Sequence, residues 1–326
     1  MVRRLVLASV CAGFALVAAV PVHAQNFKLL GSWSESNVMA YMPGLQFKKN
    51  VEAASKGKVA ITISGPEAVK PFEQMQPVTA GAFDFIYTHG TYHDKGLSGV
   101  AEILPFGPDK LRSSGVWGGI DEHYQKTHNV KLLALVSIGS KGYHCYLNKP
   151  LSDKGDWSGR KLRGVANQHA VIQALGGVPV VMDMGEVYSS IEKGVVDGAC
   201  APGFVFEATK HFEVAKNRVE PLFGLLVSMV GMNLDQWKKL SKEQQAMLSE
   251  AGAQTERDTA KIGDDALAAQ NKRLAEKGVQ VQTLSKENGA LLQTTFTNSN
   301  WSFAEKCCGD TGAKLRAMAV KAGLSK

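Results

Sequence analysis

Short apolar strands alternate with amphipathic helices along the first part of the chain. Residues 27–33 and 82–87 are short apolar runs, and residues 58–64 alternate and are rich in β-branched side chains, as strands do. Apolar residues recur at helical spacing over 42–54 and again around 72–79. The resulting order, β-α-β-α-β, predicts a doubly wound α/β lobe.

The same alternation continues in the middle of the chain. A strand is predicted at 131–137, and the chain is expected to leave the first lobe near Gly139–Gly142. The elements that follow are a strand, a helix, a strand and a helix, at 161–163, 170–175, 178–182 and 185–193. We therefore predict an α/β fold with two lobes in one chain.

A long helical tract follows. Ser241 and Gln244 fit a capping box, and an alanine-, glutamine- and charge-rich run continues from there with Gly252 and Gly263 as its main interruptions. The tract is about twice as long as an ordinary helix, so one or two helices must run across the molecule. Apolar heptads are not sustained, which argues against a coiled coil. We predict that residues 241–277 form a helical region that bridges both lobes.

The N-terminus has the pattern of a secretory signal. A basic start with Arg3 and Arg4 precedes an apolar run at 5–20 and a small-residue cleavage site ending at Ala24. The run is shorter than the roughly 20 residues that a membrane span needs. We predict a cleavable signal peptide at 1–24 and a mature protein that is secreted to the periplasm and is not membrane-embedded.

Composition and charge narrow the class of partner. The chain has 326 residues, of which 44% are hydrophobic and 21% charged, as in ordinary soluble proteins. Its formal charge of +7 becomes +5 (7 − 2) when the two leader arginines are removed. This surplus is spread over many segments without a dense basic run, so it favours anionic solutes and predicts no nucleic-acid partner.

Four cysteines remain after cleavage, namely Cys145, Cys200, Cys307 and Cys308. An oxidising compartment permits disulfides, and one long-range bridge is compatible with this number. Adjacent Cys307 and Cys308 are not expected to bond to each other without strain. The pairing and the oligomeric state stay open from the sequence.

Motifs of common enzymes are absent from the sequence. It contains no G-x-S-x-G elbow, no H-E-x-x-H, no phosphate-binding loop and no G-x-G-x-x-G. His89 and His93 are four residues apart, but Gly90 between them and a turn-like context argue against a metal site. We predict no catalytic residue, no metal site and no cofactor.

Four motifs between Gly159 and Pro202 indicate a family. They are Gly159-Arg160-Lys161-Leu162-Arg163, Ala174-Leu175-Gly176-Gly177-Val178-Pro179, Glu186-Val187-Tyr188 and Gly194-Val195-Val196-Asp197-Gly198. In this order they resemble the DctP-type solute-binding proteins of tripartite ATP-independent periplasmic (TRAP) transporters. The resemblance is strongest over 147–202 and weak elsewhere in the mature chain.

The resemblance implies a two-lobed periplasmic-binding-protein fold with hinge strands and a long bridging helix. In the family an arginine on this strand clamps the substrate carboxylate, and Arg163 occupies that position. A guanidinium suits the role because it binds a carboxylate through two parallel hydrogen bonds. The implied partners are a small organic acid and the TRAP membrane permease subunits. The alternative for Arg163 is a surface salt bridge.

Two departures from the family pattern narrow the ligand. Many members carry a second arginine about twenty residues before the clamp, where this chain has Tyr143 with His144 beside it, and we predict that both are ligand-binding residues. The asparagine often found before Pro202 is Ala201. We therefore expect a monocarboxylate with an aromatic, hydroxy or keto portion.

Further ligand-binding residues are predicted at strand ends. They are His89 and Tyr92 after the third strand, Trp33 after the first, Met184 before the Glu186 helix, and Phe204 after the D-G turn. A histidine can donate or accept a hydrogen bond, and aromatic residues form the walls of small-molecule pockets. The alternative is a turn position for His89 and core packing for the apolar residues.

The predicted division of the chain combines these elements. It places the signal peptide at 1–24, the first lobe at 25–140 plus about 227–266, the second lobe at 141–226 plus about 280–326, and the connecting helical region at 241–277. Closure of the lobes on an organic acid is the predicted function. The alternative is a secreted α/β enzyme that acts on a small carboxylated substrate, with His89, Tyr143 or Glu186 as acid or base.

Overall fold

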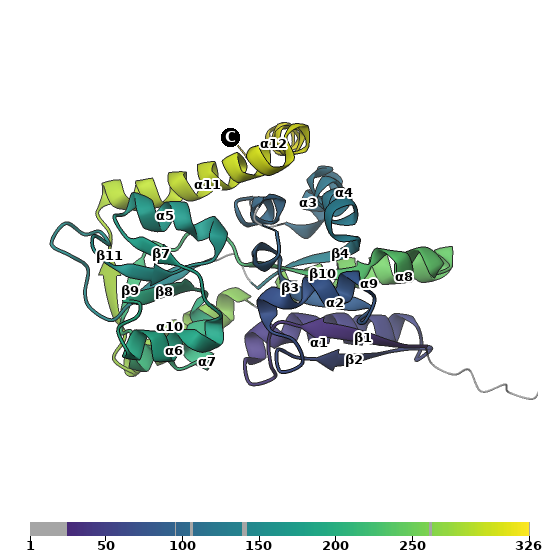
Figure 1. Cartoon of the computed structure of the whole chain (residues 1–326), viewed down its shortest axis with the longest axis horizontal. Coiled ribbons are helices and arrows are strands. Elements are labelled where there is room, and N and C mark those ends of the chain that lie inside the picture. The colour runs from purple at the N-terminus through teal and green to yellow at the C-terminus, as the bar shows by residue number, and fades with distance from the viewer. Residues whose placement is uncertain (1–24, 95, 105–106, 139–141, 261–262, 326) are drawn as a thin grey trace, which may run out of the picture.

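The computed structural model describes residues 25–94, 96–104, 107–138, 142–260 and 263–325. The predicted signal peptide and most of the predicted crossing near Gly139–Gly142 lie outside these residues. Two β-sheets with helices on their faces form two lobes side by side (Figure 1). Among the described residues, no helix has both the length and the apolar character needed to cross a membrane.

The first lobe is built on a five-stranded sheet of order β2-β1-β3-β10-β4. Its strands are β1 (Gln25–Gly31), β2 (Val59–Ser64), β3 (Phe85–His89), β4 (Val130–Ser137) and β10 (Val227–Asn233). The first three are parallel to one another, and β10 runs antiparallel between β3 and β4. The chain therefore returns from the second lobe to complete the first sheet.

Helices cover both faces of this sheet. They are α1 (Val38–Ala54), α2 (Met75–Thr79), α3 (Pro108–Ser113), α4 (Val116–His128), α8 (Leu234–Lys239) and α9 (Lys242–Ala260). Apolar residues at helical spacing, such as Phe47 and Val51 of α1, pack with Phe85 of the sheet in one core. The buried stripe of α1 thus follows the predicted period.

The second lobe is built on a six-stranded sheet of order β11-β9-β5-β8-β6-β7. Its strands are β5 (His144–Leu147), β6 (Lys161–Arg163), β7 (Val178–Val180), β8 (Gly198–Ala201), β9 (Asn217–Glu220) and β11 (Gln280–Thr283). Its helices are α5 (His169–Ala174), α6 (Met184–Glu192), α7 (Gly203–Ala208) and α10 (Gly263–Glu276). Short 3₁₀ turns at Pro71–Glu73, Gly90–Tyr92, Leu97–Glu102, Ala166–Gln168 and His211–Glu213 complete the connections.

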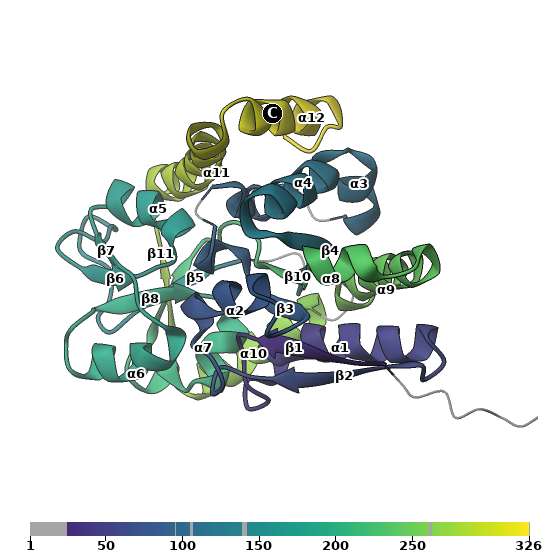
Figure 2. The same cartoon turned by 45° about the vertical axis from the view of Figure 1, so that its right-hand side comes forward.

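The C-terminal helices α11 (Lys286–Cys308) and α12 (Asp310–Lys321) extend from the second lobe to the first. Leu292 and Phe296 of α11 pack in the second lobe, whereas Trp301 packs in the first lobe's core with Leu315 of α12. Figure 2 shows α12 lying over α4. The sequence-based prediction assigns 280–326 to the second lobe, whereas α12 buries its apolar stripe against α4 of the first lobe. The lobe boundaries as a whole remain a prediction.

The structure contains elements that the sequence pattern predicts, but their first and last residues differ from the prediction. The tract predicted at 241–277 consists of two helices, α9 on the first lobe and α10 on the second, so it does pass from one lobe to the other. The strand predicted at 82–87 is β3, two residues further on at its C-terminal end. Asp84 stands directly before β3, and its carboxylate accepts a hydrogen bond from the Lys28 main chain at 2.8 Å.

Both cysteine pairs are joined by disulfides. Cys145 on β5 and Cys200 on β8 face each other in register and are bonded, as a long-range bridge requires. Cys307 and Cys308 at the end of α11 are also bonded to each other. The expectation that the adjacent pair does not bond is therefore wrong for this structure.

Candidate functional site

A cavity lies between the lobes at the carboxyl ends of β3 and β6. This is where open parallel sheets bind ligands. Six of the eight predicted ligand-binding residues line it, namely Trp33, His89, Tyr92, Tyr143, Arg163 and Met184. They come from both sheets, so the cavity is closed only when the lobes meet.

The two remaining predicted residues lie elsewhere. His144 begins β5 directly after Tyr143, and because neighbouring extended residues point to opposite faces, its ring lies on the other side of the sheet. There its Nδ1 is 3.2 Å from the Val219 carbonyl oxygen, and burial, followed by the charge of Arg218, lowers its pKa to about 4. Phe204 lines a second hollow between the lobes. Neither side chain reaches the cavity.

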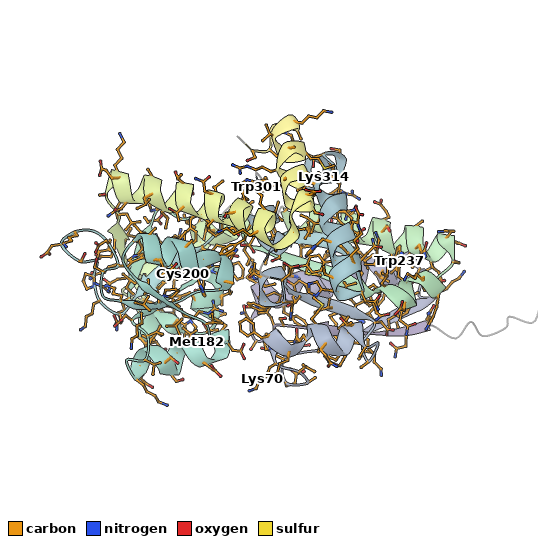
Figure 3. The ribbon with its side chains drawn as sticks, turned by 45° about the horizontal axis from the view of Figure 1, so that its top comes forward. Lys70, Met182, Cys200, Trp237, Trp301 and Lys314 are labelled. Carbon is orange, nitrogen blue, oxygen red and sulfur yellow. A yellow bond between two sulfur atoms is a disulfide. The ribbon has the colours of Figure 1, made fainter. Side chains whose placement is uncertain are left out.

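Arg163 ends β6 with only 2% of its surface exposed. Its Nε donates to the Met182 carbonyl at 3.1 Å, and Nη1 donates to the Cys200 carbonyl at 3.4 Å. In the part of the chain that the structure describes, Nη2 has no acceptor. Met182 and Cys200 both belong to the second lobe (Figure 3). The guanidinium is therefore held by main-chain atoms and presents an unused donor.

Gln168 supplies a second unused donor to the same cavity. The side chain is fully buried, and its Oε1 accepts from the Val165 main chain at 3.1 Å. That bond fixes the amide, while Nε2 has no partner among the described residues. A buried donor without a partner costs free energy, so two of them beside one cavity indicate a place for acceptor atoms of a ligand.

His89 has both ring nitrogens occupied by protein groups. Nδ1 is 2.6 Å from the Thr91 hydroxyl, and Nε2 is 2.6 Å from Glu102 Oε1 and 2.9 Å from the Tyr143 hydroxyl. The Tyr143 hydroxyl donates to Glu102 Oε2 at 2.9 Å, so its oxygen is left to accept. These partners place the proton of a neutral ring on Nε2 and leave Nδ1 to accept from Thr91. The imidazole consequently offers its face to the cavity.

Glu102 is the centre of this network. It is 1% exposed and also accepts from Asn167 Nδ2 at 2.5 Å. Burial, followed by the charge of Glu102, raises the pKa of Tyr143 well above its ordinary value. Tyr143 therefore stays a neutral donor to the carboxylate throughout the physiological range.

Aromatic rings form the rest of the first lobe's wall. The Trp33 ring centroid lies 4.9 Å from that of Tyr87 and 6.5 Å from that of Tyr92, and His89 lies 5.2 Å from Tyr92. The Tyr87 hydroxyl donates to the Ala40 carbonyl at 2.7 Å, which fixes its ring. Burial raises the pKa of Tyr92, and the charge of Arg163 opposes that rise. The wall thus suits a flat or apolar ligand body.

The cavity is small. Its volume is about 30 Å³, enough for one or two water molecules. A larger hollow of about 330 Å³ continues toward the surface beside Lys70, Asp183 and Glu186. Burial, followed by the charge of Glu186, raises the pKa of Asp183 there. A ring-shaped ligand therefore needs more room than this cavity offers in the structure.

Two important residues were not predicted from the sequence. Glu102 stands between Ala101 and Ile103 in an apolar stretch, and a carboxylate in such a stretch is a signal of a buried network. Gln168 follows Arg163 by five residues and has no comparable signal. Its placement depends on the turn at Ala166–Gln168, which the sequence pattern does not define.

The family comparison covers most of the chain. The family described as bacterial extracellular solute-binding protein, family 7 (DctP) matches residues 31–306. Among curated relatives, the ectoine/5-hydroxyectoine-binding periplasmic protein UehA of Ruegeria pomeroyi is 23% identical over 93% of this chain and 92% of its own length. The first curated relatives align over less of their length, 40% and 36% in two cases and 74% in another.

Solved structures with bound ligands have the same fold. DctP7 of Bordetella pertussis, a receptor binding pyroglutamic acid, superimposes with a TM-score of 0.77 at 18% identity, over 90% of this chain and 99% of that one. A TRAP solute-binding protein of Desulfovibrio salexigens with bound orotic acid gives 0.79 at 18% identity, over 91% and 98%. At this identity the likeness concerns the fold.

Proposed function

Because the chain belongs to family 7 of the bacterial extracellular solute-binding proteins, the DctP family, we propose that it is the periplasmic receptor for a small ring-shaped monocarboxylate. Binding of organic acids for a TRAP transporter is the function of the family. The family and its structural neighbours are receptors and not enzymes. The alternative of a secreted enzyme is therefore set aside.

The unused donors of Arg163 and Gln168 carry this proposal. Both side chains are buried, both are oriented by other bonds, and both line one cavity. A carboxylate between them would accept from each, with the Arg163 charge opposite its own. The donor that Arg163 leaves unused supports its proposed role as the clamp.

The wall opposite Arg163 and Gln168 favours a ligand with a single carboxylate. Glu102 lies buried behind His89 and Tyr143, with Oε1 2.6 Å from His89 Nε2 and Oε2 accepting from Tyr143. A second negative group placed against this wall would be repelled by Glu102 and would find no free donor on His89. The aromatic surface of Trp33 and Tyr92 instead suits a ring. Pyroglutamic acid and orotic acid, bound by two of the solved structures above, are acids of this kind.

Closure explains how the ligand is held. The arginine and the glutamine belong to the second lobe, while the histidine and the aromatic rings belong to the first. A ligand that contacts both walls binds the closed form better than the open form and shifts the population toward it. Delivery to membrane permease subunits is part of this proposal and follows from the family.

Ligand screening tests the proposal. Native mass spectrometry of the protein as purified identifies any retained acid, and melting temperatures are then compared for pyroglutamate, orotate, their neutral amides and a C4 dicarboxylate. We expect the monocarboxylates to raise the melting temperature, the amides and the dicarboxylate to do so far less, and the ligand to be recovered unchanged. Stronger stabilisation by the dicarboxylate, or chemical conversion of the acid, would contradict the proposal.

A further inference from the structure

Two imidazoles and a carboxylate meet at a separate place on the first lobe. Asp94 follows the turn at Gly90–Tyr92, and His123 and His128 lie on the last turns of α4. The sequence gives no obvious sign of the cluster, because Asp94 is 29 residues away from His123. The cluster has no residue in common with the lining of the cavity between the lobes.

The three side chains point their ligand atoms at one spot. Asp94 Oδ2 is in hydrogen-bond contact with His123 Nε2 and lies 3.3 Å from His128 Nε2. One ligand atom of each residue lies within 4.8 Å of the other two. Metal–ligand bonds of about 2.0–2.2 Å in a tetrahedral site place ligand atoms roughly 3.3 Å apart. The His128–Asp94 pair already has this spacing, whereas His123 lies closer to Asp94 and has to move away from it to share an ion.

Surrounding groups orient the ligands in the way that metal sites require. Asp94 Oδ1 accepts from the main chains of Gly96 at 2.7 Å and Leu97 at 3.1 Å, which directs Oδ2 toward the histidines. His123 Nδ1 lies 3.7 Å from Cys308 Sγ, so its second nitrogen is turned away from the cluster. Such outer contacts fix the rotamer and the tautomer of a metal ligand.

We propose that Asp94, His123 and His128 bind a divalent transition-metal ion, with Zn²⁺ as the best fit. Two imidazole nitrogens and one carboxylate oxygen form a ligand set suited to zinc, whereas Ca²⁺ and Mg²⁺ need oxygen ligands. The cluster lines a surface hollow of about 500 Å³, also lined by Thr127 and Lys306, through which an ion and a water ligand can enter. The site does not depend on the proposed organic-acid ligand.

Metal titration of the untagged protein tests this site. The protein is stripped with EDTA, exchanged into metal-free buffer, and titrated with Zn²⁺, Ca²⁺ or Co²⁺ by calorimetry and equilibrium dialysis. We expect one Zn²⁺ per chain, no saturable Ca²⁺ binding at this site, and visible absorption of low-symmetry Co²⁺. Absence of stoichiometric Zn²⁺ binding to the folded protein would show that the cluster is only a hydrogen-bonded ion pair, and would overturn the proposal.

Matched variants identify the ligands. His123→Gln and His128→Gln should each weaken Zn²⁺ binding by at least about tenfold, since loss of even an outer contact has effects of this size. The control is His93→Gln, because His93 lines the same hollow but its Nε2 is 3.0 Å from the Thr88 hydroxyl. It should bind Zn²⁺ like the wild type. Circular dichroism confirms folding of each variant; equal weakening in all three would contradict the assigned ligand set.

Discussion

The two walls of the cleft between the lobes hold their polar groups by different means. On the second lobe, Arg163 is fixed by main-chain carbonyls and Gln168 by a main-chain N–H, and each keeps an unused donor. On the first lobe, His89 contacts Thr91 and Glu102, and Glu102 accepts from Tyr143 and Asn167 of the second lobe. One wall therefore offers unused donors to an anion, whereas the polar groups around Glu102 are directed at other protein groups.

This difference assigns separate tasks to the walls. The wall formed by the second lobe, called the second wall, supplies the charge and the hydrogen bonds that recognise a carboxylate. The wall formed by the first lobe, called the first wall, determines which ligand shapes fit, through the rings of Trp33 and Tyr92 and the face of His89. Binding energy should therefore depend on single side chains of the second wall, whereas substitutions in the first wall should first affect stability.

Removal of the Arg163 guanidinium should have the largest effect. Arg163→Ala should weaken binding of the acid found by screening by roughly 100-fold or more, because loss of one partner of a buried charge pair costs about 2–5 kcal/mol. Isothermal titration calorimetry measures the loss.

Arg160→Ala is the matched control, since Arg160 is on the same segment and bonds the Lys149 and Pro150 carbonyls away from the cavity. It should leave the affinity within about a factor of two, in line with substitutions away from a site. Similar affinity losses in the two variants would remove the distinction between Arg163 and an ordinary surface arginine.

A change at the centre of the first wall should act mainly on folding. Glu102→Gln places an amide group where the carboxylate accepts from Tyr143 and Asn167 and lies 2.6 Å from His89 Nε2. Unmet donors in a buried network cost about 1–3 kcal/mol, so the free energy of unfolding in urea should fall by about 2 kcal/mol. The exposed Glu186→Gln, at the mouth of the cleft, should change it by less than about 0.5 kcal/mol.

If Glu102→Gln leaves the unfolding free energy unchanged, the network does not stabilise the first wall. If the variant binds the acid as weakly as Arg163→Ala, the division of tasks between the walls is wrong.

The smallest expected effect is a pH dependence that separates stability from binding. His144 has its pKa lowered from 6.5 to about 4 by burial and by Arg218. The unfolded chain then binds the proton more readily, so stability is complete above about pH 6.5 and falls as the pH drops toward 4. This one residue should account for a loss of about 1 kcal/mol between pH 7 and pH 5.5.

Urea unfolding at several pH values, compared with His144→Gln, measures this contribution, and the variant should show a shallower slope. Affinity for the acid should stay flat over the same range, because Arg163 remains charged. An equally steep slope in the variant would assign the pH dependence to other groups.

Much of the fold follows from the sequence pattern. The strands at 58–64 and 131–137 and the two-lobed α/β order follow from period and composition, and they recur as β2, β4 and the two sheets. Helix α11 was not predicted, because its buried residues carry only a weak apolar period. Its position is decided by contacts with both lobes, which no local pattern contains.

The site was predictable where a motif or a strand end defined it. Arg163, His89 and Trp33 stand at or just after strand ends that face the cavity between the two lobes. The roles of Glu102 and Gln168 depend on long-range hydrogen bonds, and His144 was placed by nearness in sequence to Tyr143, although alternation along β5 turns it away. Whether a residue lines the cavity therefore depends on the direction of its side chain as well as on its position in the sequence.

A crystal structure of the protein with its acid tests the central claim most directly. The account predicts that the ligand carboxylate lies about 2.7–2.9 Å from Arg163 Nη2, that it also accepts from Gln168 Nε2, and that the ligand body rests on Trp33 and Tyr92. A carboxylate bound by other groups, with Arg163 Nη2 bonded to protein or water alone, would contradict it.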